Sequence, residues 1–139
     1  MATTLTAATM TVTISESITL NGKNQGGTTT KTFASIAEIT KRILTITTAE
    51  STIATFSAAV ASAGHFIAAD VRYIRFTNLD DENFITLTFR NQDNDEAAIK
   101  LDSGQSFIWN ADNSGGLVDV LNATQDADAA SDTALGDLT

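Results

Sequence analysis

Alternation of apolar and polar residues is clearest from Met10 to Leu20. Every second residue there is apolar except Glu16, and the positions between are Thr or Ser. The apolar positions are Met10, Val12, Ile14, Ile18 and Leu20. This period of two predicts a β-strand with one apolar and one polar face. Residues 21–27, NGKNQGG, predict a hairpin tip or loop, and residues 28–34 predict a short strand.

The pattern between residues 35 and 70 is more ambiguous. Ser35 with Glu38 three positions later is the capping-box pattern and predicts one helical turn. The β-branched segments 42–48, RILTITT, and 52–57, TIATFS, predict two strands. Residues 58–70 predict a loop, in which 65–67, HFI, are candidates for pairing.

A regular series of strands and turns runs from Val71 to Asn110. Four apolar-polar segments (VRYIRFTN, FITLTFR, AAIKL and SFIWN) are separated by LDDEN, NQDNDE and DSGQ. Turns about every 12 residues are typical of antiparallel sandwiches and barrels. We therefore predict a four-stranded antiparallel meander. Its predicted inner residues are Ile74, Phe76, Ile85, Leu87, Phe89, Ile99 and Leu101.

The whole chain of 139 residues suits one all-β domain. We predict an antiparallel β-sandwich or jelly roll over residues 10–122, ending in a strand at 117–122; the pattern leaves jelly-roll and immunoglobulin-like strand orders open. Residues 123–139 are small, acidic and weakly apolar, so they bury too little surface to offset the entropy of ordering. We expect them to form a flexible C-terminal arm, and residues 1–9 a flexible N-terminal arm.

Charge and composition narrow the possible partners. Hydrophobic residues make up 42% of the chain, which argues against global disorder. The net charge is −9, and residues 111–139 hold six Asp and no basic residue. An acidic chain disfavours nucleic acid and anionic membrane as partners, because phosphate binding needs a positive surface. It suits a cationic protein partner or simple solubility.

Several segments and residue types that would carry other functions are missing from the sequence. There is no Cys for a disulfide, a thiol nucleophile or a thiolate metal site. The first residues lack the pattern of a secretory signal, and no apolar run approaches the roughly 18 residues of a membrane helix. We expect a soluble protein made in a cytoplasm.

The acidic residues of the meander are candidates for a metal or catalytic site. Successive turns of a meander lie at opposite ends of a sheet. That separates Asp80–Glu82 from the cluster of Asp93, Asp95 and Glu96, while Asp102 returns to the first end. Neither cluster has the spacing of a calcium loop, and the aromatic cleft of a paired-carboxylate glycosidase is not evident. We interpret these acids as solvated turn residues and predict no metal.

Other side chains give no enzymatic pattern. His65 is the only histidine, and its surroundings lack a G-x-S-x-G nucleophile motif, so we predict no enzyme, catalytic residue or cofactor. Four residues are candidate partner contacts: Arg72, Tyr73, Arg75 and Trp109. The alternative for the first three is an ordinary solvated strand face, and for Trp109 a core anchor.

The segments YIRFTNLD, LTF and KLDSGQSF, with SESITLNGKN and IAEITKRIL upstream, resemble small virion structural proteins of tailed bacteriophages, particularly cyanophage-like ones. The resemblance covers about residues 11–109. It implies a capsid decoration (cement) protein that is assembled in the host bacterial cytoplasm, lies on the virion surface and binds the major capsid protein or other virion proteins. A tail, neck or fibre component is the alternative. We expect a homo-oligomer, with a trimer favoured. A carbohydrate-binding module that uses Trp109 or Tyr73 is a further hypothesis.

Overall fold

The computed structural model describes residues 4–57, 63–91, 96–110 and 135–138. Apart from one short 3-10 helix, every regular element among these residues is a β-strand, which confirms the all-β prediction. The chain divides into two compact units, Met1–Arg42 and Ile43–Thr139. The division falls inside the segment 10–122 that was predicted as one domain. The strand predicted at 117–122 lies outside the described residues.

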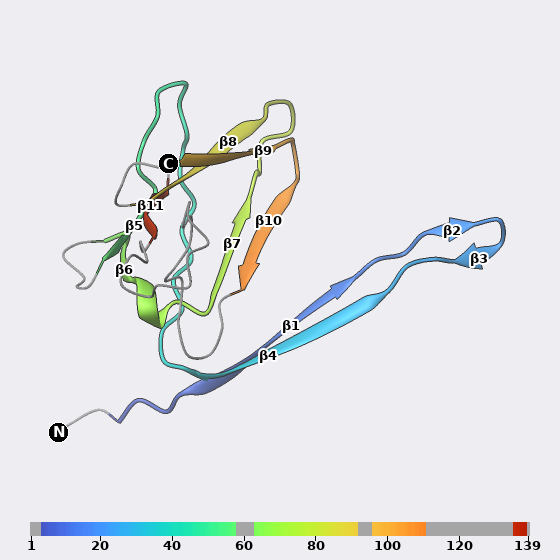
Figure 1. Ribbon diagram of the computed structural model, residues 1–139, viewed down its shortest axis with the longest axis horizontal. Coiled ribbons are helices and arrows are strands. Elements are labelled where there is room, and N and C mark those ends of the chain that lie inside the picture. Colours follow the sequence, from blue (N-terminus) through green and yellow to red (C-terminus); the bar gives the residue numbers. More distant parts are fainter. Residues whose placement is uncertain (1–3, 58–62, 92–95, 111–134, 139) are drawn as a thin grey trace, which may run out of the picture. The chain divides into compact units, whose positions relative to one another are not determined.

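The first unit contains a long antiparallel hairpin. β1 (Ala8–Ser15) pairs with β4 (Thr28–Ile36), and β2 (Thr19–Leu20) pairs with β3 (Lys23–Asn24) at the far end of the ribbon (Figure 1). β1 therefore begins inside the segment 1–9 that was predicted as an arm. The predicted strand and hairpin tip are confirmed.

The two strand pairs of the hairpin share one register. It runs from Met10 opposite Phe33 to Leu20 opposite Lys23. Backbone hydrogen bonds from Glu16 N–H to Gly27 O and from Gln25 N–H to Ile18 O, both 2.8 Å, continue this register between the strand pairs. Strands β1 and β2 therefore face β4 and β3 as parts of one continuous ribbon.

The hairpin tip is a two-residue turn at Asn21 and Gly22. Their φ angles are 51° and 75°. Positive φ at both central residues defines a type I′ turn, whose twist matches that of the flanking strands and which favours the Asn-Gly pair. The sequence NG thus fixes the register of the hairpin.

The two faces of the ribbon differ in chemistry. On one face, Phe33 is fully buried and its partner Met10 is half-buried. The other face carries three opposed hydroxyl pairs: Thr11–Thr32, Thr13–Thr30 and Ser15–Thr28. The last two pairs are hydrogen-bonded at 3.3 and 3.1 Å and are exposed. The predicted apolar and polar faces are thus present in the hairpin.

Substituting Gly26 with Ala is expected to destabilise the hairpin. A Cβ at Gly26 would overlap the carbonyl oxygen of Glu16 and lie 2.6 Å from its carbonyl carbon. Both atoms are backbone, so relief requires the two strands to separate, at a cost of about 1–3 kcal/mol. Gly27→Ala is the matched control, because its Cβ would meet open space, and it should change stability by less than about 0.5 kcal/mol. Amide hydrogen exchange at Gln25 measures the difference; equal exchange in both variants would contradict the close approach.

Residues 37–53 depart from the sequence prediction. The structure describes all of them and assigns none to a strand or helix. The helical turn predicted at Ser35 is wrong, because Ser35 lies within β4, where its φ is 59°. The strand predicted at residues 42–48 is also wrong. β-branched residues favour a strand only where another strand is available to pair with them.

The second unit contains two sheets. Its elements are β5 (Ala54–Ser57), β6 (His65–Ile67), the 3-10 helix η1 (Ala68–Asp70), β7 (Tyr73–Thr77), β8 (Ile85–Asn91), β9 (Glu96–Leu101), β10 (Ser106–Asn110) and β11 (Leu135–Leu138). One sheet has the order β6-β5-β11-β8-β9, and the other pairs β7 with β10. β5 and β6 run parallel, so the larger sheet is mixed rather than purely antiparallel as predicted.

The core of the second unit forms between these sheets. Its buried centre consists of Ala54, Phe56, Leu87 and Phe89. The half-buried apolar residues packed against it are Ile53, Phe66, Val71, Ile74, Phe76, Ile99, Phe107 and Trp109. The side chains of β7 and β10 therefore pack on those of β5 and β8. Five of the seven predicted inner residues belong to this core: Ile74, Phe76, Leu87, Phe89 and Ile99. Leu101 is also buried, and Ile85 is half-buried.

The predicted meander is correct for the β8–β9 hairpin and wrong in the pairing of its first and last strands. β7 pairs with β10, and the β8–β9 hairpin belongs to the other sheet. Alternation along a strand identifies its inward side chains, but it does not identify the neighbouring strand.

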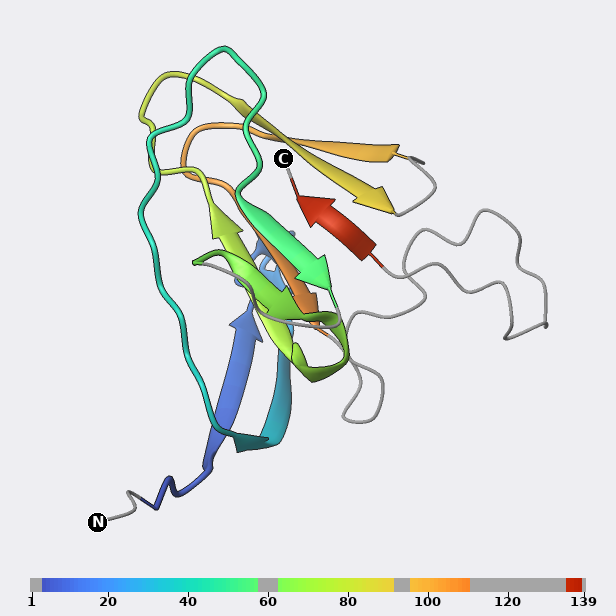
Figure 2. The same cartoon turned by 90° about the vertical axis from the view of Figure 1, so that its left-hand side faces the viewer.

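The C-terminal segment supplies a central strand. β11, red in Figure 2, lies between β5 and β8 and pairs antiparallel with both. The prediction of a flexible arm over residues 123–139 is therefore wrong for Leu135–Leu138. The rest of that predicted arm lies outside the described residues.

Candidate interaction sites

The four predicted partner contacts do not form one surface. Trp109 lies opposite Ile74 in the β7–β10 pair and packs on the core, with its ring centroid 5.1 Å from that of Phe89. Tyr73 and Arg75 alternate with Ile74 along β7, so their side chains point to the other face of that sheet. Trp109 is thus an anchor of the core.

Arg72 and Arg75 differ in their surroundings. Arg75 is exposed. Arg72 precedes β7 and donates a hydrogen bond of 2.7 Å from Nη1 to the carbonyl of Ala69 in η1. This bond ties Arg72 to its own chain, which leaves Arg75 as the more accessible of the two guanidinium groups.

Two loops that are distant in sequence meet at one end of the second unit. Ser103, in the β9–β10 turn, donates from Oγ to the carbonyl of Asp80, in the β7–β8 loop, at 2.8 Å. Gly104, with φ of 72°, makes the tight turn expected from the sequence. Its N–H donates to the carbonyl of Asn78 at 3.1 Å. The predicted return of the Asp102 turn to the Asp80 loop is thus confirmed.

Asn78 joins these two loops from a buried position. Its side-chain Nδ2 donates to the carbonyls of Asn83 at 2.8 Å and Leu101 at 3.2 Å. Its Oδ1 accepts from Asp80 N–H at 3.1 Å, and its backbone N–H donates to Gln105 O at 2.9 Å. Asn78 is only 3% exposed, so protein groups must satisfy these polar atoms. The loops are therefore fixed by one buried amide.

Asp80 caps the turn within its own loop. Its Oδ1 accepts from the backbone N–H groups of Asn83 at 2.7 Å and Glu82 at 2.8 Å. These bonds lower the pKa of the Asp80 carboxyl below its ordinary value, and the bond from Asn83 has the largest effect. Because the pKa is lower in the folded chain, the Asp80 carboxylate stabilises the fold at pH values above the ordinary pKa of about 3.9. This stabilisation is lost as the pH falls from that value through the lowered pKa.

Two large apolar side chains of the same loop face solvent. Leu79 and Phe84 are both exposed. Lys100 Nζ lies 4.6 Å from the centroid of the Phe84 ring, a cation–π distance, and pairs with Asp102 at 2.6 Å. The loop thus combines exposed apolar groups with the acids Asp80, Asp81 and Glu82.

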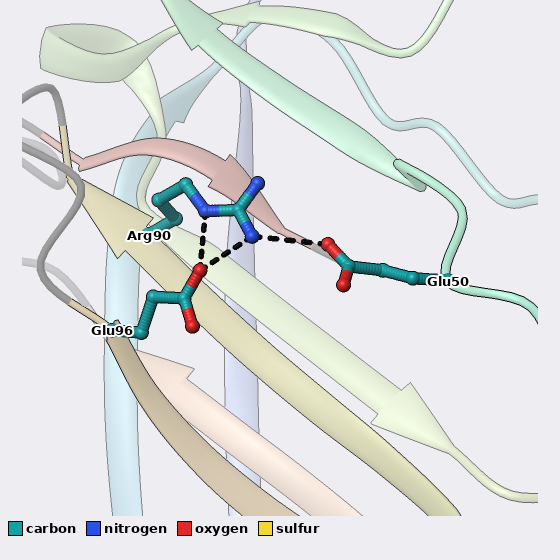
Figure 3. Close-up of polar contacts among 3 residues, drawn as sticks. All are labelled: Glu50, Arg90 and Glu96. Carbon is teal, nitrogen blue, oxygen red and sulfur yellow. Dashed lines mark hydrogen bonds and ion pairs between the residues drawn. The ribbon is translucent and has the colours of Figure 1, made fainter.

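The second predicted acidic cluster is only partly described. Asp93 and Asp95 lie outside the described residues. Glu96 accepts from Arg90 Nε at 2.7 Å, and Arg90 Nη2 also bonds to Glu50 Oε1 at 3.0 Å (Figure 3). The bonds to Glu96 and Glu50 raise the pKa of Arg90. This cluster links the strands β8 and β9 to the segment before β5.

His65 and the remaining acidic residues were the other candidates for a chemical site. His65 is a half-buried residue of β6, paired with Thr55. Among the described residues, no three His, Asp or Glu side chains are arranged to hold a metal ion. No helix in the same part of the chain has the length and apolarity needed to cross a membrane.

Sequence reasoning did not identify which large apolar side chains are exposed. Ile18 and Leu20, at the hairpin end, were predicted to be on the apolar face of a strand, yet both are exposed, as are Ile43, Leu44 and Ile46 in the segment before β5. Alternation marks an apolar face without showing whether anything covers it. The signal that distinguishes Ile18 and Leu20 is their position beside the NG turn, where a two-stranded ribbon has no other layer to pack on.

Comparisons with protein-family models, with curated proteins and with solved structures found no match to this chain.

Proposed function

We propose that this chain is a structural protein of a tailed-bacteriophage virion, and that it acts as a capsid decoration protein. In this proposal the second unit is a small β-sandwich, of jelly-roll or immunoglobulin-like type, with β7 and β10 covering the five-stranded sheet. The partner is the major capsid protein. Many copies bind across the junctions between capsid subunits, and each adds buried interface that must be broken before the subunits can part.

Support for this proposal comes first from the resemblance to small phage virion proteins. The resembling segments YIRFTNLD, LTF and KLDSGQSF contribute to β7, to β8, and to β9 and β10 with the turn between them. In them, Asn78, Asp80 and Ser103 connect the two loops. In this proposal these three residues stabilise the fold, as expected for a structural subunit of a particle.

The observation that carries the proposal is the exposed apolar segment before β5. The exposed fractions of Ile43, Leu44 and Ile46 are 79%, 46% and 44%. The segment is β-branched and belongs to no strand in the described structure. Exposed apolar residues grouped in this way are typical of protein–protein contact, and an unpaired β-prone segment can join the sheet edge of a partner. We infer that this segment contacts the capsid.

Adding the chain to capsids that lack it tests the proposal. The wild-type chain should co-sediment with these capsids and raise the temperature at which they rupture. Ile43→Asp should bind at least about tenfold more weakly, because a buried Ile contributes about 1.5–3 kcal/mol. Thr45→Asp adds the same charge at a neighbouring exposed position and should bind like the wild type. A wild-type chain that neither binds nor raises the rupture temperature would overturn the proposal.

A further inference from the structure

The end of the hairpin presents an exposed apolar row. Ile14, Ile18 and Leu20 are 43%, 57% and 61% exposed. The constant register places these even-numbered residues on one side of the ribbon, in a row that also contains Glu16, and Lys23 lies directly opposite Leu20. A two-stranded hairpin is marginal in water without a further layer on its apolar face. The row is therefore suited to contact with a partner.

The loop between β7 and β8 is a surface of matching kind. Leu79 and Phe84 are 71% and 58% exposed. The bond from Asn78 to the carbonyl of Asn83 closes the base of the loop, and the carboxylate of Asp80 holds its interior. A loop fixed in this way loses little conformational entropy on binding. Three acidic residues, 80–82, lie between Leu79 and Phe84 in the sequence.

The two units also carry opposite charge. Residues 1–42 contain four basic and two acidic residues, a net charge of +2, and residues 43–139 contain four basic and fifteen acidic residues, a net charge of −11. Two molecules of this chain therefore attract each other best when the first unit of one approaches the second unit of the other. Lys23 at the hairpin end and residues 80–82 in the loop are local examples of this complementarity.

We propose that the hairpin end of one copy docks on the loop of residues 79–84 of a second copy, with the apolar rows in contact and Lys23 facing the acids of the loop. The contact joins two different surfaces, so it forms a reciprocal dimer, a closed ring or an open filament, depending on the rotation between copies. The trimer expected from the sequence is one such ring. This self-association goes beyond the capsid role and does not rest on it, because it involves other residues than Ile43–Ile46.

Disulfide trapping tests the contact directly, since the chain has no native Cys. Leu20→Cys is mixed with a tagged Leu79→Cys variant under oxidising conditions, and the covalent heterodimer is identified by mass. The expected yield is at least about tenfold above that of the control mixture in which Thr19→Cys replaces Leu20→Cys. Thr19 is exposed like its neighbour Leu20, but its side chain points to the other face. A yield no higher than in the control overturns the proposal.

Sedimentation velocity of the free chain, without capsids, gives the second readout. Leu20→Asp should weaken self-association at least about tenfold, the loss expected for one buried leucine, and Thr19→Asp should leave it unchanged. Lys23→Glu should also weaken it, and adding Glu82→Lys in the same chain should restore it. Circular dichroism checks that each variant is folded. A chain that sediments as a monomer, or a charge swap without restoration, overturns the proposal whatever the outcome with capsids.

Discussion

Replacing Asn78 with Ala is expected to lower the unfolding free energy of the second unit by about 2–4 kcal/mol. The substitution removes the donor from the carbonyls of Asn83 and Leu101 and the acceptor from Asp80 N–H. Leu101 is buried, so water does not readily replace the donor that its carbonyl loses, and a buried group deprived of a hydrogen-bond partner costs about 1–3 kcal/mol. The loss of the other bonds accounts for the remainder.

Chemical denaturation of the wild type and three variants measures this effect. Asn78→Asp retains the acceptor but turns a carboxylate oxygen towards the two carbonyls, so it should be at least as unstable as Asn78→Ala. Asn83→Ala removes only exposed side-chain contacts of 3.3 and 3.4 Å to Asp80, and should cost less than about 1 kcal/mol. Equal stability of Asn78→Ala and the wild type would show that the buried amide does not hold the loops together.

Removing residues 135–139 is expected to destabilise the second unit by about 3 kcal/mol or more. β11 is paired at two positions with β5 and at three with β8. Each backbone hydrogen bond contributes about 0.5–1.5 kcal/mol net. Without this strand, β5 and β8 have open edges inside the sheet, which also favours aggregation.

Hydrogen exchange and denaturation of the shortened chain test the role of β11. Amides of β5 and β8 should exchange faster, while those of the hairpin β1–β4 should keep their protection. Asp137→Asn is the control, because it preserves the backbone of the strand and should therefore destabilise the second unit less than the truncation does. If the shortened chain has the stability of the wild type, β11 is not part of the sheet.

The sequence predicts a strand correctly where the alternation of apolar and polar residues within that strand is enough to identify it. Alternation over Met10–Leu20 and the NG turn identify the hairpin, and alternation at Leu87 and Phe89 identifies inward positions. Pairing depends on residues far along the chain, so β7 was assigned the wrong neighbour. β11 was missed because LGDL has neither length nor alternation, and it becomes a strand only between two others.

The residues of the candidate sites were harder to predict from the sequence than the strands were. Trp109 was considered for partner contact because of its residue type, although its spacing from Phe107 already places both on one face. Asn78 had no signal in the sequence, since an Asn before a turn is common and its importance comes from burial. The exposure of Leu20 and Leu79 depends on what covers them in three dimensions, which local patterns do not encode.

The most direct test of the capsid role is a cryo-microscopy map of virions purified from cells that make this chain. We predict density for its β-strands on the outer surface of the head, in copy number comparable to the major capsid protein, with the segment at Ile43–Ile46 against the capsid. Density confined to a single ring at the neck or tail, or its absence from the particle, would contradict that role.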